Sequence, residues 1–247
     1  MASDGESLDL SRWVTRRVGK GVSERLGFQV EGQPDLFCRV LAPDSPNGAA
    51  VVCPTLSAAR PEWASREALL SASLARRNLL TVSFDYRGDG HSPMDGRRSL
   101  ATLNEDVSAA LDLAADMAQG GPISVVGIGM GGVVSTGEVR RRGLPLALWD
   151  PPDSGYSFLV GLIRDRVVSQ MGFAPGGDTL LLDRVSVDLF AEELERHSFA
   201  DMGGFAIERE MYDGLIGLAL DDTVTRFRRD EAIDVIVGWA EKAESSR

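Results

Sequence analysis

The feature that most constrains this chain is a series of short apolar runs, each closed by a turn and followed by a helical pattern. The runs cover residues 49–53, 79–84, 123–128 and 144–149. Uninterrupted apolar runs are typical of strands buried on both faces, and their alternation with helices indicates parallel strand–helix–strand units. We therefore predict an α/β fold with a mostly parallel central sheet and flanking helices.

The N-terminal part has a different pattern. Residues 1–22 are predicted to form a helical or loosely ordered lead-in. The segments 24–32 and 35–43 alternate apolar and polar residues around a Gly-Gln-Pro turn, which is typical of an antiparallel hairpin. No repeat or linker divides the remainder, so we predict a single domain over residues 23–247.

The net charge excludes two classes of partner. The chain has 26 basic and 37 acidic residues, a formal net charge of −11 and a pI near 4.7. The negative electrostatic field around such a chain repels phosphate backbones and anionic lipids. We therefore expect neither nucleic acid nor a membrane as a partner. No apolar run approaches the roughly 20 residues that span a bilayer.

The N-terminus and the cysteines bear on the compartment. The first residues are acidic and polar, without the apolar core of a signal peptide, and Cys38 and Cys53 form no disulfide framework. We therefore expect a cytoplasmic protein. Because no cluster of His, Cys or carboxylate residues has ligand spacing, we expect no metal site and no cofactor.

A glycine-rich turn, GIGMGG at residues 127–132, joins the third apolar run to the next helix. A nucleophile elbow of the G-x-S-x-G type occupies such a turn, but the middle residue here is Gly129, which has no side chain to attack a carbonyl. The turn also matches the dinucleotide motif G-x-G-x-x-G through Gly127, Gly129 and Gly132, with Asp150 about 20 residues further on. A dinucleotide-binding protein is therefore an alternative, although at least two strands precede this turn.

Four sequence blocks together resemble the α/β-hydrolase superfamily, and within it the exosortase-associated, serine-aminopeptidase-like branch. They are CPT at 53–55, FDYRGDGHS at 84–92, VVGIGMGG at 125–132 and LWDPPDSG at 148–155, in the expected order and spacing. The family places its serine nucleophile at the position of Gly129 and its histidine after the last strand, yet no histidine follows His197. The resemblance thus implies a degenerate triad and a C-terminal part too short for both of the last strands.

The resemblance also implies a ligand pocket. The backbone N–H of Met130 and one from the Thr55-Leu56 loop would form the family's oxyanion hole, which survives the loss of the serine. Residues 155–205 take the place of the family's cap. Tyr156 in this region is predicted to line an apolar cavity, and core packing of the same helical face is the alternative.

Two titratable residues are candidates for moving a proton at the carboxyl edge of the sheet. Asp150 ends a strand where α/β proteins bind their ligands, and His91 follows the RGDG turn at the same edge. A turn or helix-capping carboxylate is the alternative for Asp150, and a structural turn is the alternative for His91. We predict Asp150 and His91 as catalytic residues and Gly129 as a binding residue.

These observations predict a degenerate α/β-hydrolase-fold protein without the serine nucleophile. We expect it to bind an acyl, ester or peptide-like small molecule, or to catalyse a non-hydrolytic cyclisation, isomerisation or epimerisation. One alternative is an interaction protein: if the last strands are missing, the strand ending at Asp150 is an exposed edge that a second copy or a partner subunit covers. Another is an esterase, thioesterase or peptidase whose nucleophile is relocated to Cys53 or Ser92.

Overall fold

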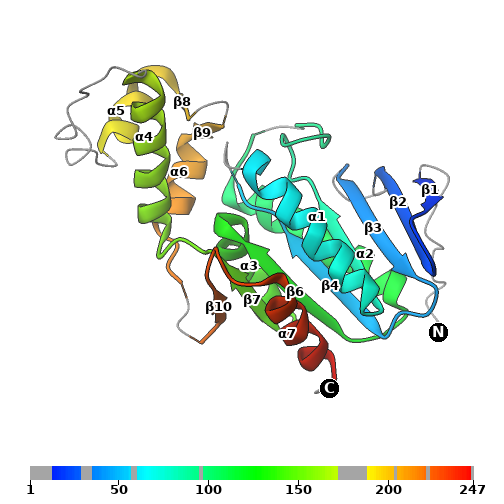
Figure 1. Ribbon diagram of the computed structural model, residues 1–247. Helices are drawn as coiled ribbons and strands as arrows, with labels where there is room; N and C mark the ends of the chain where they lie inside the picture. Colours follow the sequence, from blue (N-terminus) through cyan, green and yellow to red (C-terminus); the bar gives the residue numbers. More distant parts are fainter. Residues whose placement is uncertain are drawn as a thin grey trace, which may run out of the picture.

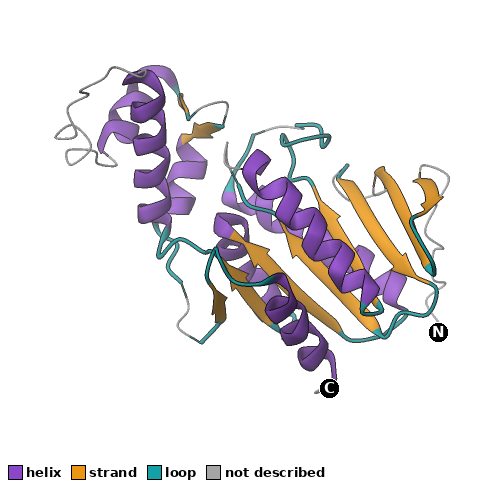
Figure 2. Cartoon of the chain, viewed as in Figure 1, coloured by secondary structure: helices purple, strands orange, loops and turns teal. Residues whose placement is uncertain are grey.

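A mostly parallel sheet forms the centre of the molecule in a computed structural model (Figure 1, Figure 2). The structure describes residues 13–28, 35–56, 60–94, 97–171, 188–202, 205–220 and 223–245. Within these residues the strands of the sheet are β1 (Trp13–Arg17), β2 (Val22–Phe28), β3 (Phe37–Pro43), β4 (Gly48–Cys53), β5 (Leu79–Phe84), β6 (Ile123–Ile128), β7 (Leu146–Trp149) and β10 (Thr225–Phe227). Their order across the sheet is β1-β2-β3-β5-β4-β6-β7-β10.

The pairing of the strands divides the sheet into two parts. β1, β2 and β3 are antiparallel to one another, and β3 is antiparallel to β5. From β5 through β4, β6 and β7 to β10, all neighbours are parallel. The predicted α/β class, with a mostly parallel sheet and an N-terminal antiparallel hairpin, is therefore confirmed.

The lead-in predicted as helical or loosely ordered is partly wrong, because residues 13–17 form the edge strand β1. Trp13 lies opposite Gly27 and is only 8% exposed, so it anchors this strand in the core. On the same pair of strands Arg16 donates to the buried carboxylate of Glu24. These contacts are made within a tight hairpin of consecutive strands, and the local spacing of apolar residues does not reveal it because most side chains of β1 are exposed.

Helices cover both faces of the sheet. One face carries α1 (Arg60–Arg76) and α7 (Ile233–Ser245), and the other carries α2 (Leu100–Ala118) and α3 (Gly129–Arg141). Side chains along a strand alternate between faces, so Val52 of β4 packs with α1 and α7, and Val51 packs on the other side. The apolar runs of the sequence are thus explained by burial on both faces.

A helical lobe stands beyond the carboxyl edge of the parallel strands (Figure 1). Its elements are α4 (Gly155–Met171), α5 (Asp188–His197), β8 (Phe199–Asp201), β9 (Ala206–Glu208) and α6 (Arg209–Ile216). The lobe corresponds to the cap-like region expected over 155–205, but it continues to Ile216 and includes a β8–β9 hairpin that was not predicted.

An exposed edge at the strand before Asp150 is expected only if the last strands are missing, and the structure places a strand beside it. β10 pairs in parallel with β7, with Thr225 opposite Ala147 and Phe227 opposite Trp149. The indole N–H of Trp149 donates to the carbonyl of Arg228 at 2.9 Å, which fastens the chain after β10 to β7. One of the two last strands implied by the family is therefore present. No helix in the described ranges has the length and apolar character that a bilayer crossing requires.

Candidate functional site

The carboxyl ends of β4, β6 and β7 meet at the side of the sheet that faces the lobe (Figure 1). Ile128 of β6 lies opposite Trp149 of β7 in the parallel register. Gly129 and Asp150 follow directly after this pair, on neighbouring strands whose backbones run about 5 Å apart. The structure therefore brings these two predicted site residues together.

Gly129 begins α3 in the left-handed region, with a φ of 52°. The preceding residue, Ile128, provides no side-chain hydrogen bond to the start of the helix. The first N–H groups of an α-helix have no intrahelical acceptor, so the amide of Met130 is available to another oxygen. This turn places a donor at the carboxyl edge of the sheet, as the family resemblance implies.

Close packing explains the other glycines of the turn. A Cβ on Gly131 would collide with the carbonyl of Pro54, whose carbon would lie 2.8 Å away. A Cβ on Gly132 would lie 2.9 Å from the Cα of Gly127. The pattern that also matches a dinucleotide motif is thus accounted for by contacts within the chain.

Thr55 fills the space above Gly129. A Cβ on Gly129 would lie 3.1 Å from the Cβ of Thr55 and still closer to its Oγ1. Thr55 is only 5% exposed, and its hydroxyl donates to the carbonyl of Leu56 at 3.3 Å. The side chain of Thr55 therefore occupies the space that a side chain at position 129 would need.

The residues around this turn are buried in a large apolar cluster. Leu56 and Met130 are 0% and 1% exposed, and they belong to the same apolar cluster as Leu159 of α4 and Tyr212 of α6. Tyr156, predicted to line the pocket, lies in the first turn of α4 and is 49% exposed. The turn is therefore buried, and the apolar cluster that surrounds it extends into the lobe.

Asp150 is also left-handed, with a φ of 52°, and its N–H donates to the carbonyl of Phe227 at 2.9 Å. Its side chain is half-buried and makes no hydrogen bond to any other described residue. The start of α4 is capped instead by Ser154 and Ser157, each accepting the other's N–H, at 3.0 and 3.1 Å. The carboxylate of Asp150 is therefore not used as the cap of α4.

His91 lies apart from these residues. Its Nδ1 is 3.3 Å from Oδ2 of Asp85, its ring centroid is 4.6 Å from that of Phe37 on β3, and its side chain is 74% exposed. The strand order places β4 and β6 between β5, which His91 follows, and β7, which Asp150 follows. Three strand spacings amount to about 14 Å, so the two predicted catalytic residues are not brought together.

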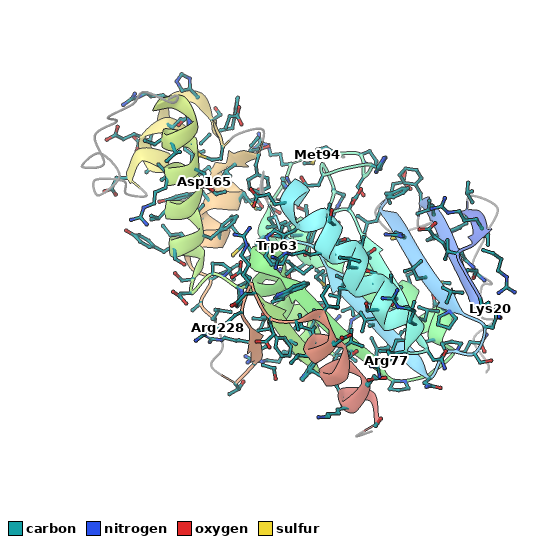
Figure 3. The ribbon with its side chains drawn as sticks, viewed as in Figure 1. Lys20, Trp63, Arg77, Met94, Asp165 and Arg228 are labelled. Atoms are coloured by element: carbon teal, nitrogen blue, oxygen red, sulfur yellow. The ribbon has the colours of Figure 1, made fainter. Side chains whose placement is uncertain are left out.

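The junction of lobe and core is polar where α4 approaches α1. Trp63 of α1 carries two guanidinium groups over its ring, Arg66 at 5.5 Å and Arg229 at 5.6 Å. Arg229 also pairs with Glu62 at 2.9 Å. Burial, and then the charge of Glu62, raise the pKa of Asp165 on α4. Figure 3 shows Trp63 on the core and Asp165 on the lobe.

A comparison with known families identifies the family to which the chain belongs. A family model described as "Alpha/beta hydrolase family" matches residues 50–243, which include the sheet from β4 to β10, the lobe and most of α7. The chain belongs to the alpha/beta hydrolase family. No curated protein matches the sequence of this alpha/beta hydrolase significantly.

Several solved structures are similar to this chain at low sequence identity. Alpha/beta hydrolase domain-containing protein 10 from mouse is 14% identical, with a TM-score of 0.55 over 90% of this chain and 98% of that one. A hydrolase from Pseudomonas aeruginosa is 17% identical, with a TM-score of 0.43 over 89% of this chain and 79% of that one. DcsB, solved with a substrate analogue, is 20% identical, with a TM-score of 0.41. The match covers 66% of this chain and 56% of DcsB.

Other hydroxyl and thiol groups near the turn of this alpha/beta hydrolase are engaged in packing. Cys53 is fully buried, and burial raises the pKa of its thiol to about 12. Ser135 donates to the carbonyl of Gly132 at 2.7 Å. Ser92 donates to the carbonyl of Asp85 at 2.5 Å. None of these three presents an activated nucleophile.

Two residues of the site region escaped the sequence prediction. The Thr55 side chain was expected only as part of a backbone donor loop. Arg98 was not expected at all: its side chain is 7% exposed, it pairs with Asp89, and its guanidinium lies 4.8 Å from the ring centroid of Phe205 in the lobe. Its Nε is buried without an acceptor in the described part of the chain. A buried arginine has no signature in the local sequence.

Proposed function

We propose that this member of the alpha/beta hydrolase family does not hydrolyse through a serine at the turn after β6. It binds an acyl, ester or peptide-like small molecule at the backbone N–H groups of Leu56 and Met130, here called the amide cradle. Non-hydrolytic cyclisation, isomerisation or epimerisation of that molecule is the reaction class such a site favours. The observation that carries the proposal is Gly129, which offers a hydrogen atom where the family resemblance implies a nucleophile.

The amide cradle acts on a ligand by electrostatics. Backbone N–H groups aimed at an oxygen stabilise negative charge on it without rearrangement, and they are strongest where water is excluded. Leu56 and Met130 meet the second condition because both residues are almost fully buried. A carbonyl oxygen held there is polarised towards an oxyanion or enolate, which is the charge development that these non-hydrolytic reactions share.

Asp150 is the group placed to move a proton next to the amide cradle. It follows the strand adjacent to Gly129, and its half-buried carboxylate makes no hydrogen bond to the described residues. A carboxylate so placed can take a proton from a carbon beside the polarised carbonyl. His91 lies three strands away and has no part in this step.

The ligand of this site is a small molecule rather than a nucleic acid or a membrane, because the net charge of −11 opposes phosphate-rich surfaces. Two free, buried cysteines fit a reducing cytoplasm. We place the protein there on these grounds.

Active-site labelling tests the proposal. The protein is incubated with a fluorophosphonate probe and, separately, with p-nitrophenyl acetate and butyrate. We expect no covalent adduct by intact-protein mass spectrometry and ester turnover at the rate of the buffer blank. An adduct, or turnover lost in Cys53→Ala or Ser92→Ala, would establish a relocated nucleophile and refute the proposal.

A further inference from the structure

We propose that β1 is a dimerisation edge, and that two copies of the chain pair their β1 strands in an antiparallel arrangement with Thr15 on the twofold axis. The partner at this edge is therefore a second copy of the chain. β1 lies at the outer end of the sheet, on the side away from the lobe (Figure 1). This inference does not depend on the amide cradle or on the proposed function.

The backbone of β1 has a row of hydrogen-bonding groups that β2 does not use. The N–H of Val18 donates to the carbonyl of Val22 at 3.0 Å, so these two residues form a hydrogen-bonded pair of the β1–β2 hairpin. Hydrogen-bonded and non-hydrogen-bonded pairs alternate along antiparallel strands. Residues 14 and 16 therefore bond to β2, and residues 13, 15 and 17 point their N–H and C=O groups outward. Within the described residues, β2 is the only strand that pairs with β1.

β1 lacks the features that protect an exposed sheet edge. Proline, lysine, bulges and very short strands all hinder pairing with another chain. β1 contains neither proline nor lysine, and it pairs with β2 over five consecutive residues without a bulge. Its Val14 is 69% exposed, more than any other large apolar side chain that the structure describes. The opposite edge strand, β10, has only three residues, so β1 is the edge better suited to pairing.

The charges near β1 also favour contact between two copies. Both arginines of the strand are held by acids of their own chain: Arg16 donates to Glu24, and Arg17 pairs with Asp44 at 2.8 Å. Residues 13–28 and 35–44 together carry five basic and three acidic side chains, whereas the whole chain has a net charge of −11. Two such copies repel each other, and the repulsion is weakest when their β1 ends meet.

A twofold axis through Thr15 makes β1 complementary to itself. The outward residues 13, 15 and 17 meet residues 17, 15 and 13 of the partner subunit, and each pair exchanges two backbone hydrogen bonds. Val14 then lies opposite the partner's Arg16, whose aliphatic stem covers the exposed valine. The two Thr15 side chains become direct cross-strand neighbours, which is a favourable pair.

The expected dimer is weak. Pairing of two five-residue strands buries less than the roughly 1,200 Å² of a standard interface. We therefore expect a dissociation constant of about 10–100 µM, so that the dimer forms only at high protein concentration.

Sedimentation velocity of the full chain from about 5 to 300 µM tests the proposal. The wild type is expected to shift from a monomer of 26.6 kDa towards twice that mass as the concentration rises. Thr15→Pro removes an outward N–H and leaves the bonds to β2 intact, so it should fold and weaken dimerisation at least about tenfold. Val14→Lys places a like charge opposite the partner's Arg16 and should weaken dimerisation about 3- to 10-fold. Val168→Lys, at a valine of α4 that is 55% exposed, is the matched control and should leave dimerisation unchanged.

Cysteine cross-linking tests the register. Thr15→Cys places two thiols on the axis with their Cα atoms about 5.5 Å apart, within the reach of a disulfide. Arg17→Cys, its matched control, places them four strand residues apart, which is about 14 Å. Because both native cysteines are buried, only Thr15→Cys should give a disulfide-linked dimer on a non-reducing gel, with oxidised glutathione as the oxidant.

Three outcomes overturn the proposal. The first is a wild type that stays monomeric over the whole concentration range. The second is a Thr15→Pro variant that is folded by thermal unfolding and dimerises like the wild type, because the dimer then uses another surface. The third is equal cross-linking of Thr15→Cys and Arg17→Cys. If Thr15→Pro does not fold, the comparison of Val14→Lys with Val168→Lys takes its place, and equal dimerisation of these two variants overturns the proposal.

Discussion

Two residues that follow different strands compete for one small volume at the centre of the site. Gly129 has a φ of 52°, a region that residues with a Cβ adopt at a cost, and the side chain of Thr55 lies directly above it. Either feature alone disfavours a side chain at position 129. Together they imply that replacing Gly129 lowers the free energy of unfolding through overpacking as well as through backbone strain.

We expect Gly129→Ser to destabilise the fold by about 2–4 kcal/mol, from backbone strain and overpacking against Thr55. In a Thr55→Gly background the same substitution should cost at least about 1 kcal/mol less, since the clash is removed and only the strain remains. The measurement is the free energy of unfolding from denaturant titration.

Gly137→Ser provides the matched control, because Gly137 lies in the same helix and a Cβ there would meet open space. It should be neutral or stabilising. Strictly additive effects of Gly129→Ser and Thr55→Gly would contradict the shared volume. Because no histidine follows the last strand in the family's order, Gly129→Ser should also remain without esterase activity.

At the scale of elements, α3 is fixed to α2 by a group of charges at its C-terminal end. Glu138 accepts from Arg141 at 2.6 and 2.8 Å and from Arg142 at 2.7 Å, and Arg142 also reaches Asp112 of α2 at 2.6 Å. The hydrogen bonds from Arg141 lower the pKa of Glu138 most; burial opposes them, and with the added bond and charge of Arg142 the pKa is about 2. These bonds hold the helix whose other end forms the amide cradle.

Glu138→Gln is expected to lower the free energy of unfolding by about 1–2 kcal/mol at pH 7. A carboxylate whose pKa is depressed on folding contributes stability above its unfolded value near 4.5 and loses it as pH falls towards 2. The difference between variant and wild type should therefore shrink between pH 4.5 and pH 2. Glu192→Gln, on the exposed pair with Arg196, should change stability little at any pH; a constant Glu138 effect across this range would contradict the assignment.

The strand β10 was not predicted from the sequence. The four apolar runs could be recognised because burial on both faces of the sheet leaves an uninterrupted apolar stretch in the sequence. β10 consists of Thr225, Arg226 and Phe227, a short and mostly exposed segment whose conformation depends on pairing with β7. β1 also escaped prediction because four of its five residues are exposed, which leaves no apolar pattern in the sequence.

Trp149→Phe tests the attachment of β10. The substitution keeps an aromatic ring beside Trp63 but removes the N–H that donates to the carbonyl of Arg228 at 2.9 Å. We expect a loss of about 1–3 kcal/mol in unfolding free energy, because the bond from the indole is lost and the smaller ring leaves space in the core, although the N–H of Glu231 still donates to the same carbonyl at 3.1 Å. Arg228→Ala keeps that carbonyl and should be close to wild type. Equal effects of the two variants would refute the role of the indole N–H.

At the scale of the whole molecule, the lobe and the core are joined around Arg98. Its guanidinium pairs with Asp89 of the core and lies 4.8 Å from the ring centroid of Phe205 in the lobe. We expect Arg98→Ala to speed amide hydrogen exchange in β9 and α6 by about tenfold, because the cation–π contact and the buried ion pair are lost. Arg97→Ala, at a side chain 82% exposed and 3.8 Å from Glu208, should have little effect. Unchanged exchange in Arg98→Ala would show that the lobe is held by its apolar contacts alone.

The site was predictable in part at this scale. The sequence places Thr55, His91, Gly129 and Asp150 at the carboxyl ends of strands, and therefore at one edge of the sheet. It does not show the lateral order of the strands, and that order separates His91 from Asp150 by the width of β4 and β6. Gly129 and Asp150 are adjacent because β6 and β7, which are consecutive in the sequence, are also paired in the sheet.

The shared volume above α3 has a consequence for how such a protein changes over generations. A lineage that acquires a nucleophile at position 129 must first replace Thr55 by a smaller residue, because the reverse order passes through an overpacked intermediate. The two positions are therefore epistatic.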